Sequence, residues 1–283
     1  TDAGRGLVLV EANLAGPVTV DWRGDADGGY VDTAPAIVAR LLARRGVPPA
    51  RIGASFASLA APQKIALYFD RQARVREAVD LAARSILAWV LPDLDNVWQI
   101  GFFRPPQGAP VETWTRFDVV SIEAGDRAPE TPAAKITLRY ARNYRPLSEN
   151  EIAPALSTEG DPAYDPDLVA RLREPWRRVV WEDAGVRARY RNPRELAIDT
   201  ALVDQADAEA ALAEQAAWHG VPRAELVVVR EMTDAALARQ LGEEVHLTYP
   251  AQQLDLDAVI TSIRPGAPRP GLITFNLRTE ALA

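Results

Sequence analysis

The order of its periodic segments constrains the fold of this chain more than any other feature of the sequence. Three segments repeat apolar residues at the spacing of a helix, and long stretches with the two-residue alternation of β-strands lie between them. Because helices and strands do not alternate one by one, the pattern argues against a doubly wound α/β sheet. We therefore expect an α+β fold, in which β-rich domains with barrel-like or sandwich-like sheets carry three separated amphipathic helices.

The three predicted helices have recognisable ends. The first begins after Asp32 or Thr33, carries a proline in its first turn and ends at Gly46, and these residue types favour those positions. The third runs over about 204–219 and is followed by Gly220, which we expect just beyond its last turn. The second has one apolar stripe, made of Val75, Ala78, Val79, Ala82, Ile86 and Trp89.

The remaining segments predict strands, turns and one polar excursion. The segment 88–103 predicts a hairpin, because the Pro-Asp-Leu-Asp-Asn cluster at 92–96 is typical of turns. The polar, proline-marked segment 145–165 predicts a connector or an exposed excursion. A short helix then opens at Asp165 and is stopped by Pro175. Further predicted strands lie at 7–11, 17–22, 64–69, 111–115, 117–122, 134–144, 177–182, 194–200, 224–230, 243–249, 257–263 and 271–277.

We expect three regions along the chain. Residues 1–32 are expected to form N-terminal strands that complete a sheet of a longer chain. Residues 33–125 should form an α+β domain with two helices and a hairpin, and 126–283 a β-rich domain with a crossover helix near 204–219. The chain begins at Thr1, and its one methionine lies far from the start. Removal of an initiator and excision from a longer polypeptide both explain this, and we favour the second interpretation.

The composition excludes several classes of function. The absence of cysteine excludes disulfides, thiolate metal ligands and a cysteine nucleophile. A formal net charge of -7 argues against a nucleic-acid-binding protein, which usually presents a basic face to the phosphates. No stretch approaches the ~18 uninterrupted apolar residues of a membrane-spanning helix, so we expect no membrane segment.

Residues that carry most enzyme chemistry are scarce or badly spaced. The two histidines, His219 and His246, have no third ligand at a metal-binding spacing, and we expect structural or surface roles for both. His219 falls in the last turn of a predicted helix, where the helix dipole favours a cation. His246 lies on the polar side of a predicted strand. The serines of 53–58 do not reproduce a nucleophile elbow, and the sequence has neither a P-loop nor a dinucleotide-binding motif.

Acidic residues are plentiful, and two pairs could imitate the carboxylate pair of a glycosidase: Asp93 with Asp95, and Glu123 with Asp126. Among 39 acidic residues such pairs arise by chance, and turn formation already explains Asp93 and Asp95. The sequence therefore predicts no catalytic, cofactor-binding or metal-binding residues, no cofactor and no enzymatic activity.

The tryptophans point to packing and to contact. Trp176 and Trp181 lie in an arginine-rich stretch, and two roles remain possible for them: contacts at a subunit interface, or a platform that binds sugars. We favour the interface, because aromatic residues and arginines are the usual anchors of protein contacts. Core packing is expected for the four that share a face with other apolar residues: Trp22, Trp89, Trp98 and Trp114.

Four segments that cover well over half of the chain carry a resemblance, and they are VREAVDLAARSILAWVLPDLDNVWQIGFFRPPQGAPV (75–111), DTALVDQADAEAALAEQAAWHGVPRAELVVV (199–229), LGEEVHLTYPAQQLDLDAVITSIRPGAPRPGLITFNLRTE (241–280) and VDTAPAIVARLLARRGV (31–47). They resemble tail proteins of long-tailed bacteriophages and prophages, in the family of tail-hub, baseplate-hub and tip-attachment proteins. The family's hairpin turn usually carries glycine where Asp95-Asn96 stand here, and 145–165 has no counterpart that can be placed.

The resemblance implies a structural component of a virion. Such a protein would form the hub or tip ring, usually a homo-trimer, that joins the tail tube to the tip and lets DNA pass without specific binding. Its partners would be distal tail, tail tube, tape-measure and tip or fibre proteins, and it would assemble in the bacterial host cytoplasm. A carbohydrate- or receptor-binding tail module using Trp176, Trp181 and 145–165 is the alternative, and a cell-wall hydrolase the third.

Overall fold

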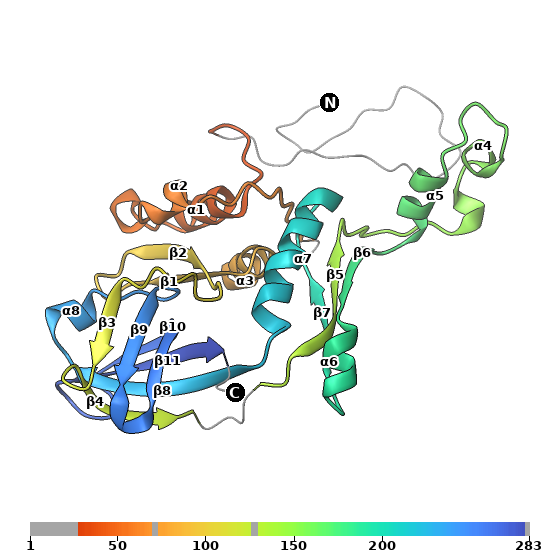
Figure 1. Ribbon diagram of the computed structural model, residues 1–283. Coiled ribbons are helices and arrows are strands. Elements are labelled where there is room, and N and C mark those ends of the chain that lie inside the picture. The colour runs from red at the N-terminus through yellow and green to blue at the C-terminus, as the bar shows by residue number, and fades with distance from the viewer. Residues whose placement is uncertain (1–27, 70–72, 126–129, 281–283) are drawn as a thin grey trace. The chain divides into compact units, whose positions relative to one another are not determined.

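The computed structural model describes residues 28–69, 73–125 and 130–280 (Figure 1). These residues form two compact units, one made of 28–31 and 143–177 and the other of 32–142 and 178–280. The three regions expected from the sequence stay predictions. Four further sequence predictions fall outside the described residues: the strands at 7–11 and 17–22, Trp22, and Asp126.

The first predicted helix is confirmed as α1 (Ala34–Arg44) of the larger unit. Thr33 occupies the N-cap position, although its side chain makes no capping hydrogen bond. Gly46 takes a φ of +82°, the left-handed conformation that glycine adopts readily after a helix. The helix buries Val38 and Leu42 on the stripe that faces the core.

The second predicted helix, α3 (Val75–Ser85), is shorter than its apolar stripe suggested. Buried Ser85 donates its hydroxyl to the carbonyl of Leu81 and accepts the amide of Ala201, which ties the end of the helix to a distant segment. Leu87 then takes a φ of +53°, so the chain reverses. Trp89 consequently lies in a strand, and its assignment to the helical stripe was wrong.

The predicted strand at 64–69 is also wrong, because consecutive residues of this segment pair with different partners. The amide of Ile65 donates to Asp32, whereas the amide of Ala66 donates to Ala201. Only isolated bridges form at Lys64 and Ile65, and no continuous ladder follows. Two short helices before it were not predicted: η1 (Pro49–Arg51) and α2 (Ser55–Ser58).

A three-stranded sheet and a long helix form the second layer of the larger unit, and they share one hydrophobic core with α1 and α3. Helix α7 packs on strand β5, which runs parallel to β7 (Figure 1). Gly220 caps α7 with a right-handed φ of -79°, not the left-handed position expected beyond the helix. The elements, in sheet order and then by helix, are β6 (Arg177–Glu182), β5 (Ala133–Tyr140), β7 (Arg194–Asp199), α6 (Ala184–Arg189) and α7 (Gln205–His219).

A six-stranded sheet forms the other half of the larger unit and has its own core around Trp114 and Phe275. All its pairings are antiparallel except that of β3 with β9. The short helix α8 (Asp234–Leu237) lies between two of its strands in sequence. Its strands in spatial order are β3 (Glu112–Thr115), β9 (Glu244–Tyr249), β10 (Leu254–Pro265), β11 (Leu272–Glu280), β8 (Arg223–Glu231) and β4 (Val119–Ala124).

This sheet is curled into a half-barrel, because its two edge strands follow each other in sequence. Residues 116–118 alone join β3 to β4, so the two edges meet at this turn. Across the seam between β3 and β4, the guanidinium of Arg230 donates two hydrogen bonds of 3.1 Å to Glu112. Gln252, in η3 (Pro250–Gln252), donates its side-chain amide to the carbonyl of Ile122. The α+β fold with β-rich layers is as predicted.

The smaller unit contains the polar excursion. Its helices are short: η2 (Glu149–Glu151), α4 (Pro154–Ser157) and α5 (Pro166–Arg173). As predicted, Asp165 opens the last of them, where its carboxylate accepts the amide of Leu168. Within the residues that the structure describes, no helix is both long and apolar enough to cross a membrane.

Candidate binding pocket

The predicted hairpin, β1 (Ala88–Pro92) and β2 (Trp98–Phe102), carries a turn whose shape is fixed by one carboxylate. Asp93 accepts hydrogen bonds from the amides of Asp95 and Val97 and from the side chain of Gln99. Burial acts to raise the pKa of Asp93, but these three donors outweigh it and lower the pKa below its usual value. The turn-forming explanation of Asp93 is therefore confirmed.

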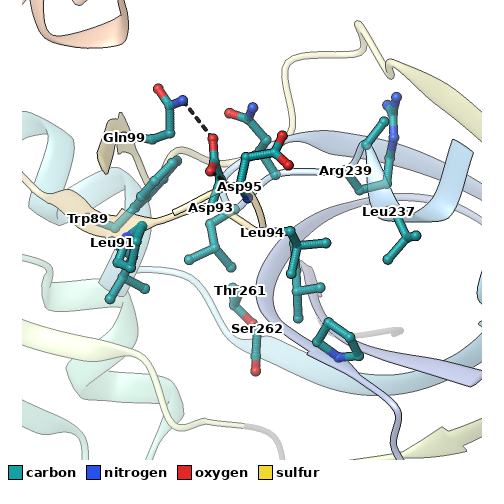
Figure 2. A pocket seen from close by; sticks show the side chains of 16 residues that line it. Trp89, Leu91, Asp93, Leu94, Asp95, Gln99, Leu237, Arg239, Thr261 and Ser262 are labelled. Carbon is teal, nitrogen blue, oxygen red and sulfur yellow. Dashed lines mark hydrogen bonds between the residues drawn. The ribbon is translucent and has the colours of Figure 1, made fainter. Parts of the chain in front are cut away.

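The turn is held in place by Ser55, one of the serines of 53–58 that do not form a nucleophile elbow. Ser55 donates its hydroxyl to Gln99 at 2.7 Å and accepts the amide of Ile100. Gln99 in turn donates to Asp93 at 2.9 Å, as Figure 2 shows. Ser55 therefore orients the hairpin and has no histidine partner for nucleophilic chemistry.

The hairpin tip faces the half-barrel across a pocket of about 340 Å³ (Figure 2). On the barrel side, strand β10 is irregular between Ile260 and Ser262, and such a bulge re-aims side chains beside it. On the hairpin side, Leu91 and Leu94 remain 49% and 57% exposed at the lip. The pocket is lined by Trp89, Leu91, Pro92, Asp93, Leu94, Asp95, Gln99, Leu237, Ala238, Arg239, Gln240, Leu241, Thr261, Ser262, Ile263 and Pro265.

A close backbone approach joins the two walls. A Cβ atom at Gly242 would lie 2.5 Å from the carbonyl oxygen of Phe102 and 2.9 Å from Nε1 of Trp89. Only glycine fits this contact, and its φ of +78° also favours glycine. The buried Nε1 of Trp89 has no hydrogen-bond partner among the described residues.

The charges around the pocket are predominantly negative. Asp93 and Asp95 lie on the hairpin side, and Arg239 on the barrel side (Figure 2). Arg239 already has two carboxylate neighbours, Glu112 at 3.7 Å and Glu243 at 3.3 Å. Its positive charge is therefore largely balanced within the barrel, and the two aspartates on the hairpin side dominate the field in the pocket.

The two histidines lie elsewhere and behave oppositely. The imidazole of His246 bridges Asp257 at 2.7 Å and Asp255 at 3.0 Å. The bond to Asp257 raises the pKa of His246, burial opposes this, and Asp255 adds to the rise. Burial, and then the nearby Arg278, lower the pKa of His219 to about 4. His219 is thus neutral near pH 7, because burial and the nearby arginine outweigh the preference of a helix end for a cation.

The tryptophans are mainly packing residues. Trp114 is fully buried, and Trp89 and Trp98 are half-buried, consistent with the packing roles expected for them. Trp181 is half-buried, packs on the core that α1 and α7 share, and lies against Gly220. Trp176, in the smaller unit, is also half-buried. Neither Trp176 nor Trp181 forms an exposed aromatic platform.

Sequence reasoning missed the pocket. The exposed leucines of the turn were its only local signal, because turns are usually polar. The other wall comes from 237–241 and 261–265, far along the sequence, and its position follows only from the strand order. Among the described residues, no group of three or more histidine, aspartate or glutamate side chains is arranged to hold a metal ion.

The fold defined above is that of an α+β protein with a curled half-barrel sheet, and comparison with solved structures finds similarity to three phage tail proteins. The tail protein from Neisseria meningitidis MC58 has 12% identity and a TM-score of 0.48, with 87% of this chain and 66% of that one covered. The 43 kDa tail protein of prophage MuSo2 from Shewanella oneidensis has 11% identity, a TM-score of 0.46, and coverages of 89% and 68%. Prophage tail protein gp18 from Listeria monocytogenes EGD-e has 11% identity, a TM-score of 0.36, and coverages of 73% and 53%.

This chain therefore spans between about half and two thirds of the length of these proteins. At such identities and TM-scores, the likenesses assign this chain neither a family nor a function. No family model matches the sequence, and no curated protein matches it.

Proposed function

We propose that this chain is a structural, non-enzymatic component of a phage tail, and that it forms part of the hub or tip ring that joins the tail tube to the tip. The proposal starts from the four segments that resemble tail-hub proteins. What supports it in the structure is that neither the six-stranded nor the three-stranded sheet of the larger unit is closed by pairing of its edge strands among the described residues. Strands β3 and β4 end one sheet, and β6 and β7 end the other.

The β4 edge carries apolar side chains in a position to be covered by another chain. Phe117, in the turn that joins the two edges, is 83% exposed, and Val120 is 50% exposed. The guanidinium of Arg116 lies over the ring of Phe117 at 4.5 Å, an aromatic and arginine pair of the kind that anchors protein contacts. An open edge of this kind can pair with a strand of a neighbouring subunit, which buries both.

In this role the chain assembles as a homo-trimer at the tail tip of the virion, within the bacterial host cytoplasm. Its neighbours are distal tail, tail tube, tape-measure and tip or fibre proteins. The net charge of -7 suits a channel lining that repels passing DNA without binding it. A basic lining in the assembled ring would contradict this last point.

The two alternatives have less support. A receptor- or carbohydrate-binding module would use exposed tryptophans, whereas Trp176 and Trp181 are half-buried. A hydrolase would need two carboxylates that flank the bond to be cleaved, whereas Asp93 and Asp95 lie on one wall of the pocket, in a single turn that Asp93 holds by three hydrogen bonds.

The test is co-assembly with tail tube and distal tail proteins of the same phage, followed by light scattering and negative-stain microscopy. We expect rings on mixing with the unaltered chain and a loss of rings with Val120→Lys, which places a charge at the β4 edge. Val221→Lys is the matched control, because Val221 is an exposed valine in the loop between α7 and β8. If rings form equally well with Val120→Lys, the β4 edge is not needed for assembly and no longer supports the proposed hub role.

A further inference from the structure

The pocket between the hairpin tip and the half-barrel combines an apolar interior with an acidic rim. Leu91 in β1 and Leu94 in the turn line it on the hairpin side, and Leu241 and Ile263 form part of the opposite wall. Asp95 lies at the rim on the hairpin side (Figure 2). A ligand that fills this space must therefore present apolar surface and positive charge close together.

Hydrogen bonds in the turn and a close backbone approach hold the two walls of the pocket in place. Three hydrogen bonds to Asp93 fix the turn, and Asn96 holds a φ of +60°, which asparagine tolerates better than most residues. Gly242 locks the hairpin against the barrel through its contact with Phe102. A preformed site costs little ordering entropy when it binds, so even a small ligand can use it.

Asp93 and Asp95 supply carboxylate oxygens that can accept hydrogen bonds from a cationic group in the pocket. A carboxylate offers about four acceptor positions, and Asp93 uses three of them within the turn. Asp95 stands next to it and is exposed. Arg239 is paired with Glu243 and shares Glu112 with Arg230, so two arginines face two glutamates there and little positive charge is left to cancel that of the aspartates. Charge complementarity therefore selects a basic group on the hairpin side of the pocket.

We propose that this pocket binds a short segment of a partner protein that carries a lysine or arginine next to a leucine or isoleucine. The apolar side chain enters between Leu94 and Ile263, and the basic group lies against Asp93 and Asp95. This inference deepens the proposed function and rests on it, because in a tail the partner is a neighbouring tail protein.

Fluorescence anisotropy with three labelled hexapeptides of sequence GSLRSG, GSLESG and GSSRSG tests the proposal on the full chain. We expect saturable binding of the Leu-Arg peptide and at least tenfold weaker binding of both the Leu-Glu and the Ser-Arg peptides. Binding should weaken as salt is raised, since the rim charges are accessible to counter-ions. Equal binding of the three peptides, or no binding of any, would overturn the proposal.

Two variants place the binding in the pocket. Asp95→Asn should weaken the Leu-Arg peptide at least threefold, and Leu94→Ser should weaken it as well. Both side chains are exposed in the turn, so neither change disturbs a core. Glu123→Gln, an exposed carboxylate of β4 outside the pocket, is the matched control and should leave binding unchanged. Binding that survives both pocket variants would place the peptide elsewhere and refute the inference.

Failure here is distinguishable from failure of the proposed function. Rings that assemble while no peptide binds would refute the pocket's role and leave the hub role standing. A peptide that binds as expected to a chain that never joins tail proteins would refute the hub role.

Discussion

A single buried arginine, Arg230, links the two ends of the six-stranded sheet. Its guanidinium donates to both carboxylate oxygens of Glu112 in β3 and to the carbonyl of Asp118 beside β4. It also lies 4.5 Å from the ring of Trp114. Burial acts to raise the pKa of Glu112, but the bonds from Arg230 and Trp114 lower it, so the carboxylate is ionised where it closes the seam.

Removing that carboxylate should therefore open the seam. We expect Glu112→Gln to lower the free energy of unfolding by about 3–5 kcal/mol, because it leaves the buried charge of Arg230 without its main partner. Urea denaturation followed by circular dichroism measures the loss. Asp80→Asn is the control, since it breaks an exposed helix pair with Arg76 and should cost no more than about 0.5 kcal/mol. A similar small loss for Glu112→Gln would show that the seam does not depend on this pair.

His219 gives the chain a stability that depends on pH. The folded-state pKa of His219 is about 4, below the ordinary value of 6.5. The stability that depends on a neutral His219 is therefore fully present above pH 6.5. As the pH falls from 6.5 towards 4, the imidazole of His219 is protonated in the unfolded chain but stays neutral in the folded chain. Stability should then fall by up to about 1.4 kcal/mol per pH unit. Thermal unfolding across this range should show a clearly flatter profile for His219→Gln.

His246 supplies the contrasting case. Because the pKa of His246 is raised in the folded chain, His246 stabilises the fold below pH 6.5. This stabilisation is lost as the pH rises through the folded-state pKa. His246→Gln should therefore flatten the profile above pH 6.5 and leave the acid side unchanged. Identical profiles for the two variants would contradict both assignments.

Some residue roles could be predicted from the sequence, and others could not. The role of Asp93 follows from local turn chemistry, which needs no knowledge of the rest of the chain. The role of His219 does not, because its pKa is set by burial and by Arg278, a residue of the last strand. The helix dipole alone favours a cation at His219, but burial and Arg278 outweigh it, and neither can be seen in the local sequence.

At the scale of elements, the hairpin and the half-barrel are joined where Gly242 meets Phe102 and Trp89. We expect Gly242→Ala to destabilise the chain more than Gly266→Ala does, as measured by urea denaturation. Both glycines have positive φ, which costs a substituted residue roughly 1–2 kcal/mol. Only at Gly242 does the new Cβ also meet backbone and indole atoms, because nothing lies within 4 Å at Gly266. Equal losses would mean that the two elements separate easily.

Elements with a complete local signal were predicted well. Helix α1 has its cap position, first-turn proline and terminal glycine in sequence, and β11 has a clean alternation. The segment 64–69 has the composition of a strand, but its amides pair alternately with Asp32 and Ala201. Its real conformation depends on which segments flank it in space, and composition does not contain that information.

At the scale of the whole molecule, the strand order was beyond sequence reasoning. Consecutive strands β3 and β4 end at opposite edges of one sheet, and only the curl of that sheet brings them back together. The pocket could not be predicted from the sequence for the same reason, since its two walls are about 150 residues apart in the chain. The positions of the edge strands, which support the assembly role, also follow from this topology and not from any motif.

The mass of the purified chain in solution tests the assembly role most directly. Light scattering, on the chain alone and mixed with tail tube and distal tail proteins, gives that mass without labels. We expect a species near three times the 30.9 kDa of one chain, or a larger ring that forms on mixing. A stable monomer that ignores the tail proteins at every concentration tried would contradict the account.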